Sequence, residues 1–332
     1  MSRFSLKLET TEQELINKIE TLKKISALIA SKILKELKIY DSLQRPRSPE
    51  EVFHMNNYIG LEKEFHYIFE ILADMKLLEK QGEFYQEGPT RISLEKKYQT
   101  EILEENNDIF GSINYLFEKI SSKYISILKG EQGKLNSKEL INFLDCLHGS
   151  EFVFMIRELF FKQLTTRVSI FSETTKLNIL NWGVGSGYDA VHIADFFGLR
   201  ASIISIEPDN EVYRGKVLQD LYEIYNLDFV ERSHLEISLL SGTIDLFFGN
   251  GIFFFESFSE IVKVIKKLLK DEGFLALIIN KDIDLATKWV FSVFDKYKVA
   301  EDRDSLIAKF KHSGLSRVKY VGLNDSFVLL QK

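Results

Sequence analysis

Cysteine and long apolar runs are scarce in this sequence, and its positive charges are outnumbered by its negative ones. Its 332 residues include one cysteine, Cys146. A single cysteine excludes an internal disulfide and a thiolate metal cluster, and it favours a reducing, cytoplasmic location. The longest apolar run, residues 247–255, is interrupted by Gly249, Asn250 and Gly251, and it falls short of the ~20 apolar residues that span a bilayer. We therefore expect a cytoplasmic protein that does not enter the membrane.

The net charge argues against nucleic acid and anionic lipid as general partners. Lysine and arginine total 43 against 49 aspartates and glutamates, so the net charge is -6. An acidic chain has no general attraction to nucleic acid or to anionic lipid. Histidines and carboxylates do not cluster at metal-ligand spacing, so we expect no metal site. The partner that we expect is a small molecule.

Apolar residues are abundant, and their pattern changes along the chain. They make up 45% of the sequence and include 27 Phe and 13 Tyr. A chain of this length is too long for one typical core, which indicates more than one domain. The first half has apolar residues at helical spacing over 11–40, and it continues with helical patterns over 100–170.

The first hundred residues show the order of a winged helix. Ser48 and Glu51 form a capping-box sequence with Pro49 at the first helical position. A third helix is expected over 61–75, and residues 76–85 are typical of a hairpin. The third helix is acidic, however, and an acidic helix is a poor reader of DNA because phosphate contacts dominate affinity.

The second half alternates strands with helices. Strands are expected at 177–182, 201–206, 228–231, 244–248, 274–279, 318–321 and 327–330, with helices at about 188–197, 211–225 and 257–270. This alternation predicts an α/β fold with a mostly parallel sheet covered by helices on both faces. The closing hairpin would add an antiparallel edge strand.

A glycine-rich turn follows the first of these strands. It runs Asn181-Trp182-Gly183-Val184-Gly185-Ser186-Gly187, and such a turn before a helix lets a ligand approach the backbone. A dinucleotide fingerprint would need glycine at position 188, where Tyr188 stands. Glu207 lies 20 residues beyond Gly187 and ends the second strand. A carboxylate there can accept hydrogen bonds from both hydroxyls of a ribose.

The glycine spacing and Glu207 resemble class I S-adenosylmethionine-dependent methyltransferases, and the likeness extends over residues 177–332. It implies a Rossmann-like domain with S-adenosyl-L-methionine as cofactor. The cofactor-binding residues that it implies are Asn181, Gly183, Gly185, Gly187, Glu207, Pro208, Ser233, His234 and Asn250. Two positions depart from the family: Asn181 replaces a frequent acidic residue, and Ser233 or His234 stands where an acidic residue is usual near the adenine.

The N-terminal half resembles the winged-helix dimerisation domain of small-molecule O-methyltransferases. This likeness implies a homodimer and three parts: residues 1–100 for dimerisation, 101–172 as a helical linker beside the substrate, and 173–332 for the cofactor. The acceptor would then lie between the linker and the loops after the fourth and fifth strands. The residues concerned are His148, 152–155, Asn250, Gly251 and 253–255.

The catalytic base that some relatives use is missing from this sequence. Plant-type relatives have a histidine base after the fourth strand, but residues 250–260 contain none. Glu256 and His148 are therefore the catalytic candidates, and His192 is a further histidine to consider. Methyl transfer need not use a strong base, because an activated sulfonium and an in-line acceptor can supply much of the rate.

Three functions remain open from the sequence. The first is methyl transfer to a small-molecule acceptor, with oxygen as the expected atom. The second is a regulatory winged helix joined to a nucleoside-sensing Rossmann-like domain. The third is an enzyme on the methyltransferase fold that does not transfer methyl groups.

Overall fold

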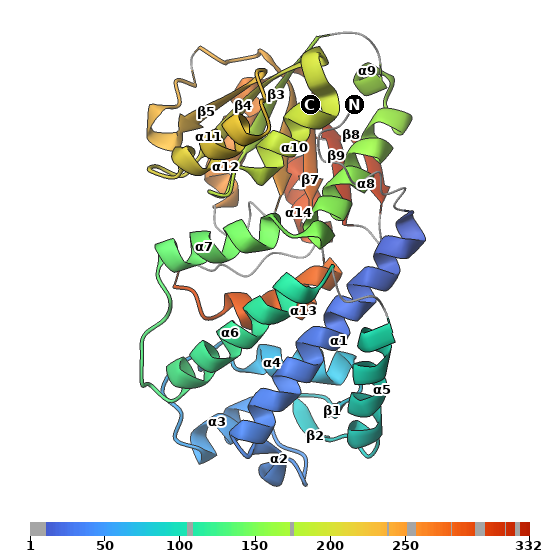
Figure 1. The fold of residues 1–332 in the computed structure, drawn as a ribbon, viewed down its shortest axis with the longest axis vertical. Coiled ribbons are helices and arrows are strands. Elements are labelled where there is room, and N and C mark those ends of the chain that lie inside the picture. Colours follow the sequence, from blue (N-terminus) through green and yellow to red (C-terminus); the bar gives the residue numbers. More distant parts are fainter. Residues whose placement is uncertain are drawn as a thin grey trace. The chain divides into compact units, whose positions relative to one another are not determined.

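The computed structural model describes residues 11–104, 109–172, 176–237, 239–250, 257–279, 281–295, 303–315, 317–322 and 326–332. The chain forms two compact units (Figure 1). The sheet unit consists of Met1–Leu15, Ile141–Lys281 and Lys298–Lys332, and the helical unit consists of Ile16–Leu140 and Asp282–Tyr297. The expected three-part division of the chain stays a prediction. Among the described residues, no helix combines the length and the apolar character needed to cross a bilayer.

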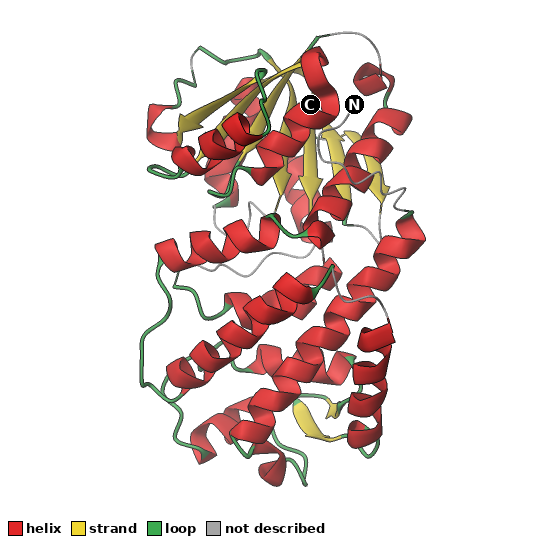
Figure 2. Cartoon of the chain, in the orientation of Figure 1, coloured by secondary structure: helices red, strands yellow, loops and turns green. Residues whose placement is uncertain are grey.

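The helical unit is built from helices with one small hairpin (Figure 2). Its elements are α1 (Glu12–Glu36), α2 (Ile39–Ser42), α3 (Pro49–Met55), α4 (His66–Asp74), β1 (Leu78–Gln81), β2 (Phe84–Glu87), α5 (Arg91–Glu104), α6 (Gly111–Leu128) and α13 (Lys281–Phe291). The first residues of α1, before Ile16, and the first residue of α13 are assigned to the sheet unit. The predicted capping box is confirmed, because Ser48 Oγ accepts from the Glu51 amide and Glu51 accepts from the Ser48 amide. The predicted hairpin is confirmed as well.

Two helix boundaries differ from the expected ones for a backbone reason. The helix expected over 11–40 is divided, because Lys38 takes a left-handed conformation with φ of 56° between α1 and α2. The helix expected from residue 61 begins only at His66, and Leu61 has a φ of 62°. Apolar spacing continues across both breaks, so periodicity alone does not reveal them.

A late segment completes the core of the helical unit. Trp289 of α13 is fully buried, and its Nε1 donates to Ser26 Oγ of α1 at 2.7 Å. The rings of Phe117 and Tyr124 in α6 meet the Trp289 ring edge to face. The Leu135 amide also donates to the Val293 carbonyl at 2.8 Å. The described residues 282–295 therefore belong to this unit although they follow most of the sheet unit in sequence.

The sheet unit holds a seven-stranded sheet in the order β5-β4-β3-β6-β7-β9-β8. Its strands are β3 (Leu177–Trp182), β4 (Ala201–Glu207), β5 (Leu227–Glu231), β6 (Ile244–Asn250), β7 (Leu269–Ile278), β8 (Arg317–Gly322) and β9 (Phe327–Gln331). Its helices are α7 (Ser137–His148, from Ile141 onward), α8 (Glu151–Arg167), α9 (Ser169–Ser172), α10 (Tyr188–Phe197), α11 (Val212–Leu221), α12 (Phe258–Leu268) and α14 (Arg303–His312), with short 3-10 turns Gly198–Arg200 and Arg232–His234.

The closing hairpin lies at one edge of the sheet, as predicted. β9 is antiparallel to its neighbours, as predicted, and it lies between β7 and β8, so β8 forms the edge. All five residues of β9 are buried, which suits a strand that is paired on both sides.

β7 starts at Leu269 and not at the expected residue 274, because Leu269 pairs with Ile244 across an irregular register.

Helices cover both faces of the sheet. On one face, Ile261 and Ile265 of α12 and Phe310 of α14 share a core with β-strand residues such as Leu180 and Leu277. On the other face, the rings of Phe160 and Phe161 in α8 contact the Phe248 ring of β6. The α/β fold predicted from the alternation of strands and helices is therefore confirmed.

The alternation of side chains along β3 and β4 brings three buried polar residues together on one face of the sheet. Successive side chains of a strand point to opposite faces, so Asn181, Ser205 and Glu207 share the face covered by α8 and α10. Asn181 pairs with Ser205 in the parallel register of β3 and β4, and Glu207 ends β4. These side chains therefore gather where the strands end beside the glycine turn.

Candidate cofactor site and active site

Two glycines of the turn between β3 and α10 have no room for a side chain. A Cβ at Gly183 would overlap the carboxylate of Glu207. Gly187 has a φ of 74°, and a Cβ there would meet the backbone of Gly215 in α11. Glycine is thus required at Gly183 by close approach and at Gly187 by both conformation and contact.

Glu207 closes a chain of hydrogen bonds across the two strand ends. Its Oε2 accepts from the Gly185 amide at 2.8 Å, and its Oε1 accepts from Ser205 Oγ at 2.7 Å. Ser205 Oγ in turn accepts from Asn181 Nδ2 at 2.8 Å. The carboxylate is buried, and burial raises the pKa of Glu207 to about 7 against the opposing effect of its two donors.

This arrangement retains unused acceptors. An ionised carboxylate offers about four lone-pair sites, and two protein donors occupy Glu207 in the described part of the chain. Asn181 is fully buried, and its Oδ1 accepts no hydrogen bond from any described residue. The acceptors at Glu207 fit a pair of sugar hydroxyls, and the Asn181 oxygen fits one further N–H or O–H donor. The residues present therefore fit a nucleoside-bearing cofactor.

The segment after β5 presents a residue that the sequence did not single out. Arg232 donates to the Gly183 carbonyl at 2.6 Å, and its guanidinium lies 5.2 Å from the centre of the Trp182 ring. The predicted Ser233 and His234 are exposed instead: the Ser233 amide donates to Asp209 at 2.9 Å, and His234 pairs with Glu231 at 3.4 Å. The only sequence signal for Arg232 was its place directly before them.

The predicted Pro208 is half-buried and follows β4. Asn250, also half-buried, ends β6 and points toward α10, where its Nδ2 donates to Asp189 Oδ1 at 3.3 Å. Asp189 is itself in the first turn of α10 and directly follows Tyr188 after the glycine turn. Asn250 is therefore held beside the turn through Asp189.

Asp189 is the centre of a buried ionic cluster. Arg157 of α8 donates to Asp189 Oδ1 at 2.7 Å and to the His148 carbonyl at 3.0 Å. His148, at the end of α7, places its Nδ1 3.4 Å from Asp189 Oδ2. Burial alone would raise the pKa of Asp189, but the charges of His148 and Arg157 hold this pKa well below its ordinary value. The predicted His148 thus lies against a permanent negative charge.

His192 belongs to the core and not to a reaction centre. Its Nδ1 accepts from Arg157 Nε at 3.3 Å, and its Nε2 lies 3.0 Å from Glu158 Oε2. Because a guanidinium always donates, Nδ1 keeps its lone pair and the ring is the neutral tautomer with the proton on Nε2. Burial lowers the pKa of His192, in agreement with this state. The ring also stacks on Phe154 at 4.2 Å, so it is unavailable as a base.

Sequence reasoning missed Arg157 although the signal was present. It is the one arginine in the apolar run 152–161, and a fully buried arginine requires a charged partner. Phe152 and Met155, which were expected near the acceptor, are buried packing residues. The other expected acceptor residues, Gly251 and 253–255, lie outside the described residues, as does Glu256.

The fold of this chain is similar to that of several solved methyltransferases. It is similar to the crystal structures of two carbon methyltransferases, DszA (TM-score 0.65, 14% identity, 96% of this chain and 91% of that chain covered) and CurJ (TM-score 0.65, 14% identity, 97% and 93% covered). An O-methyltransferase family 2 protein from Planctomyces limnophilus DSM 3776, in complex with apigenin, is also similar (TM-score 0.51, 14% identity, 93% and 92% covered). No protein-family model and no curated protein matches the sequence.

Proposed function

We propose that this protein is an S-adenosylmethionine-dependent methyltransferase that acts on a small molecule. The observation that carries the proposal is the buried carboxylate of Glu207 at the tip of β4, held against the glycine turn by the Gly185 amide. The shared fold with carbon and oxygen methyltransferases supports it. S-Adenosylmethionine, when bound, supplies a methyl group activated by a sulfonium.

The chain's own residues would hold this cofactor in distinct ways. Glu207 would accept hydrogen bonds from the ribose hydroxyls through its two unused lone-pair sites. Asn181 would accept one hydrogen bond through its buried Oδ1. Gly183 and Gly187 would keep the turn packed against Glu207 and α11, and Gly185 would hold Glu207 through its amide. Pro208, Ser233, His234 and Asn250 would lie at the margins of the site.

His148 is the proposed base among the described residues, and Asp189 is the group that positions it. Asp189 Oδ2, 3.4 Å from His148 Nδ1, would orient the imidazole ring toward the acceptor. Such help matters most for an acceptor hydroxyl with a high pKa. Glu256 remains the second proposed base.

The expected acceptor atom is oxygen, and carbon is the specific alternative. The neighbours with the higher TM-scores are named carbon methyltransferases, whereas the apigenin complex belongs to an O-methyltransferase family protein. Incubation with S-adenosylmethionine and either apigenin or an activated-methylene compound, followed by mass spectrometry and NMR, would show whether a methyl group is added and to which atom. No methylated product from a broad panel of both types would contradict methyl transfer.

A substitution at His148 separates catalysis from binding. We expect His148→Gln to lower kcat roughly a hundredfold, within the range for loss of a general base, while the affinity for S-adenosylhomocysteine changes little. An unchanged kcat would remove His148 from the reaction.

Two further proposals concern the oligomeric state and the cellular location. The N-terminal residues, with α3, α4 and the β1–β2 hairpin in winged-helix order, are proposed to form a homodimer, which sedimentation analysis would test. A cytoplasmic location is proposed from the lone, exposed Cys146, and cell fractionation would test it.

A further inference from the structure

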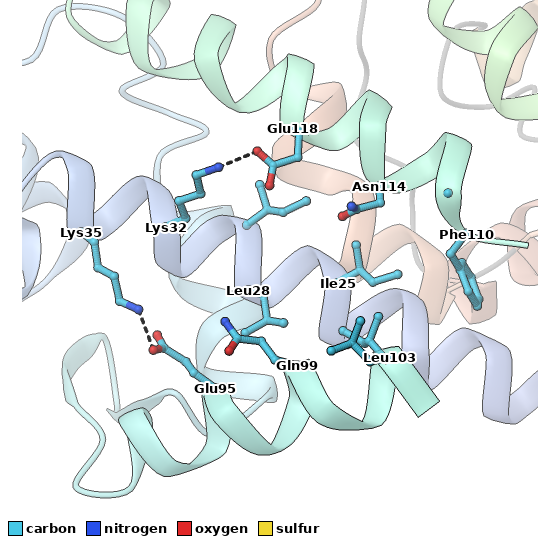
Figure 3. A pocket seen from close by; sticks show the side chains of 13 residues that line it. Ile25, Leu28, Lys32, Lys35, Glu95, Gln99, Leu103, Phe110, Asn114 and Glu118 are labelled. Atoms are coloured by element: carbon cyan, nitrogen blue, oxygen red, sulfur yellow. Dashed lines mark hydrogen bonds and ion pairs between the residues drawn. The ribbon is translucent and has the colours of Figure 1, made fainter. Parts of the chain in front are cut away.

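A concave surface lies within the helical unit, between α1, α5 and α6 (Figure 3). The groove has a volume of about 690 Å³, inside the roughly 300–1,000 Å³ range of small-molecule pockets. Its floor is apolar and comes from Ile25, Leu28 and Ile29 of α1, with Leu103 and Phe110 toward one end. Nothing in the proposed methyl transfer uses this groove.

The charged groups that border the groove neutralise one another. Lys32 of α1 pairs with Glu118 of α6 at 2.7 Å, and Lys35 of α1 pairs with Glu95 of α5 at 2.6 Å. Glu95 also accepts from Arg91 at 3.1 Å. Burial alone would raise the pKa of Glu95, but these donors lower it below its ordinary value, so the carboxylate stays ionised and paired. A charged ligand would have to break an existing pair.

Two neutral amides face the groove from opposite walls. Gln99 projects from α5 and Asn114 from α6 (Figure 3), and neither side chain makes a hydrogen bond to another described residue. Each amide offers both a donor and an acceptor. The groove therefore combines an apolar floor with uncharged hydrogen-bonding groups.

The ion pairs also limit what can enter. They join α1 to α6 and α1 to α5 (Figure 3), so charged side chains border the apolar floor where Lys32 and Lys35 lie. From Ile25 to Lys35 the groove follows α1 for roughly 15 Å, at 1.5 Å per residue. That length suits a compact molecule of two or three rings.

We infer that this groove is a binding site for a small, uncharged, apolar molecule that carries one hydrogen-bonding group. The ring system lies on the floor formed by Ile25, Leu28 and Ile29. The polar group lies between Gln99 and Asn114. The site is separate from the proposed cofactor site, because each of its lining residues belongs to the helical unit.

Two matched variants of α5 test the inference in the full chain. Leu103 lines the groove and is 72% exposed, whereas Ile92 is 59% exposed and does not line it. Both side chains are exposed, so arginine at either position should leave the fold intact. The probe is N-phenyl-1-naphthylamine, an uncharged molecule with aromatic rings and one N–H, whose fluorescence rises in an apolar site.

We expect one saturable site with a micromolar Kd, at least tenfold weaker binding in Leu103→Arg, and unchanged binding in Ile92→Arg. Saturating S-adenosylhomocysteine should not displace the probe. Non-saturable binding, equal loss in both variants, or displacement by S-adenosylhomocysteine would overturn the inference. So would sedimentation showing that Leu103→Arg converts a dimer to a monomer, since a second copy would then cover the groove. Calorimetry with S-adenosylhomocysteine reports on the proposed function independently.

Discussion

The carboxyl group of Glu207 is ionisable and almost fully buried. Burial raises its pKa from 4.5 to about 7, so the folded protein binds this proton more tightly than the unfolded chain does. The stability that the group contributes is full below pH 4.5 and is lost as pH rises through about 7. The same carboxylate must be ionised to use all its acceptor sites, so ligand binding and proton release should be linked.

Glu207→Gln should remove this pH dependence. Between pH 5.5 and pH 8 we expect the free energy of unfolding of the wild type to fall by about 2 kcal/mol relative to the variant. Urea unfolding at the two pH values would measure it. Glu231→Gln, at the tip of the neighbouring strand β5, is the control and should follow the wild type. Parallel pH curves for wild type and Glu207→Gln would contradict the account.

The Arg157–Asp189 pair makes a second prediction at this scale. Arg157→Met would leave the Asp189 carboxylate buried without the guanidinium that donates to it at 2.7 Å, and loss of one partner of a buried pair costs about 3–5 kcal/mol. Adding Asp189→Asn should recover part of this loss. Chemical denaturation of the two single variants and the double variant gives the coupling energy. Simple additivity of the two losses would show that the pair does not act as a unit.

Individual site residues were predictable where the backbone dictates them. The glycines and Glu207 follow from a turn after one strand and a carboxylate at the end of the next. Arg157 and Asp189 could not be paired from sequence, because they lie 32 residues apart on different helices. Ser233 and His234 were chosen by position along the chain, whereas Arg232 is the residue that bonds to the turn.

At the scale of elements, the turn between β3 and α10 packs against the end of β4, where Glu207 lies. Gly183→Ala would drive a methyl group into the space of the Glu207 carboxylate. We expect S-adenosylhomocysteine affinity to fall at least tenfold, as measured by calorimetry, because the carboxylate must move away from the turn. Gly133→Ala, where a Cβ meets nothing within 4 Å, should bind like the wild type. Retained affinity in Gly183→Ala would show that the contact is not needed.

Elements with strong local signals were predicted well. The bounds of β3 and α10 agree with the expected ones, because a short apolar run, a glycine turn and a helical pattern follow one another directly. The start of β7 was missed because residues 269–273 are polar in part and join the sheet only through an irregular pairing with β6. The edge position of β8 depends on β9 inserting beside β7, and local sequence does not encode that order.

At the scale of the whole molecule, the helical unit needs a segment from far along the chain. A fragment of residues 11–140 lacks Trp289, which is fully buried against Phe117 and Tyr124. We expect this fragment to show no cooperative thermal transition by circular dichroism, because the missing ring leaves a large cavity. Joining residues 282–297 through a flexible linker should restore the transition. Cooperative melting of the fragment alone would contradict the assignment of α13 to the core of the helical unit.

This organisation could not be read from the sequence. Ser26 and Trp289 are 263 residues apart, yet they share a hydrogen bond in one core. Local periodicity does not indicate that α13 packs in the helical unit while β7 and α14 on either side belong to the sheet unit.

The most direct test of the central claim is calorimetric titration of the full chain with S-adenosylhomocysteine, in the wild type and in Glu207→Ala. The account predicts a single saturable site in the wild type and at least a tenfold loss of affinity in the variant. No measurable binding to the wild type, or equal affinity in the two proteins, would contradict it.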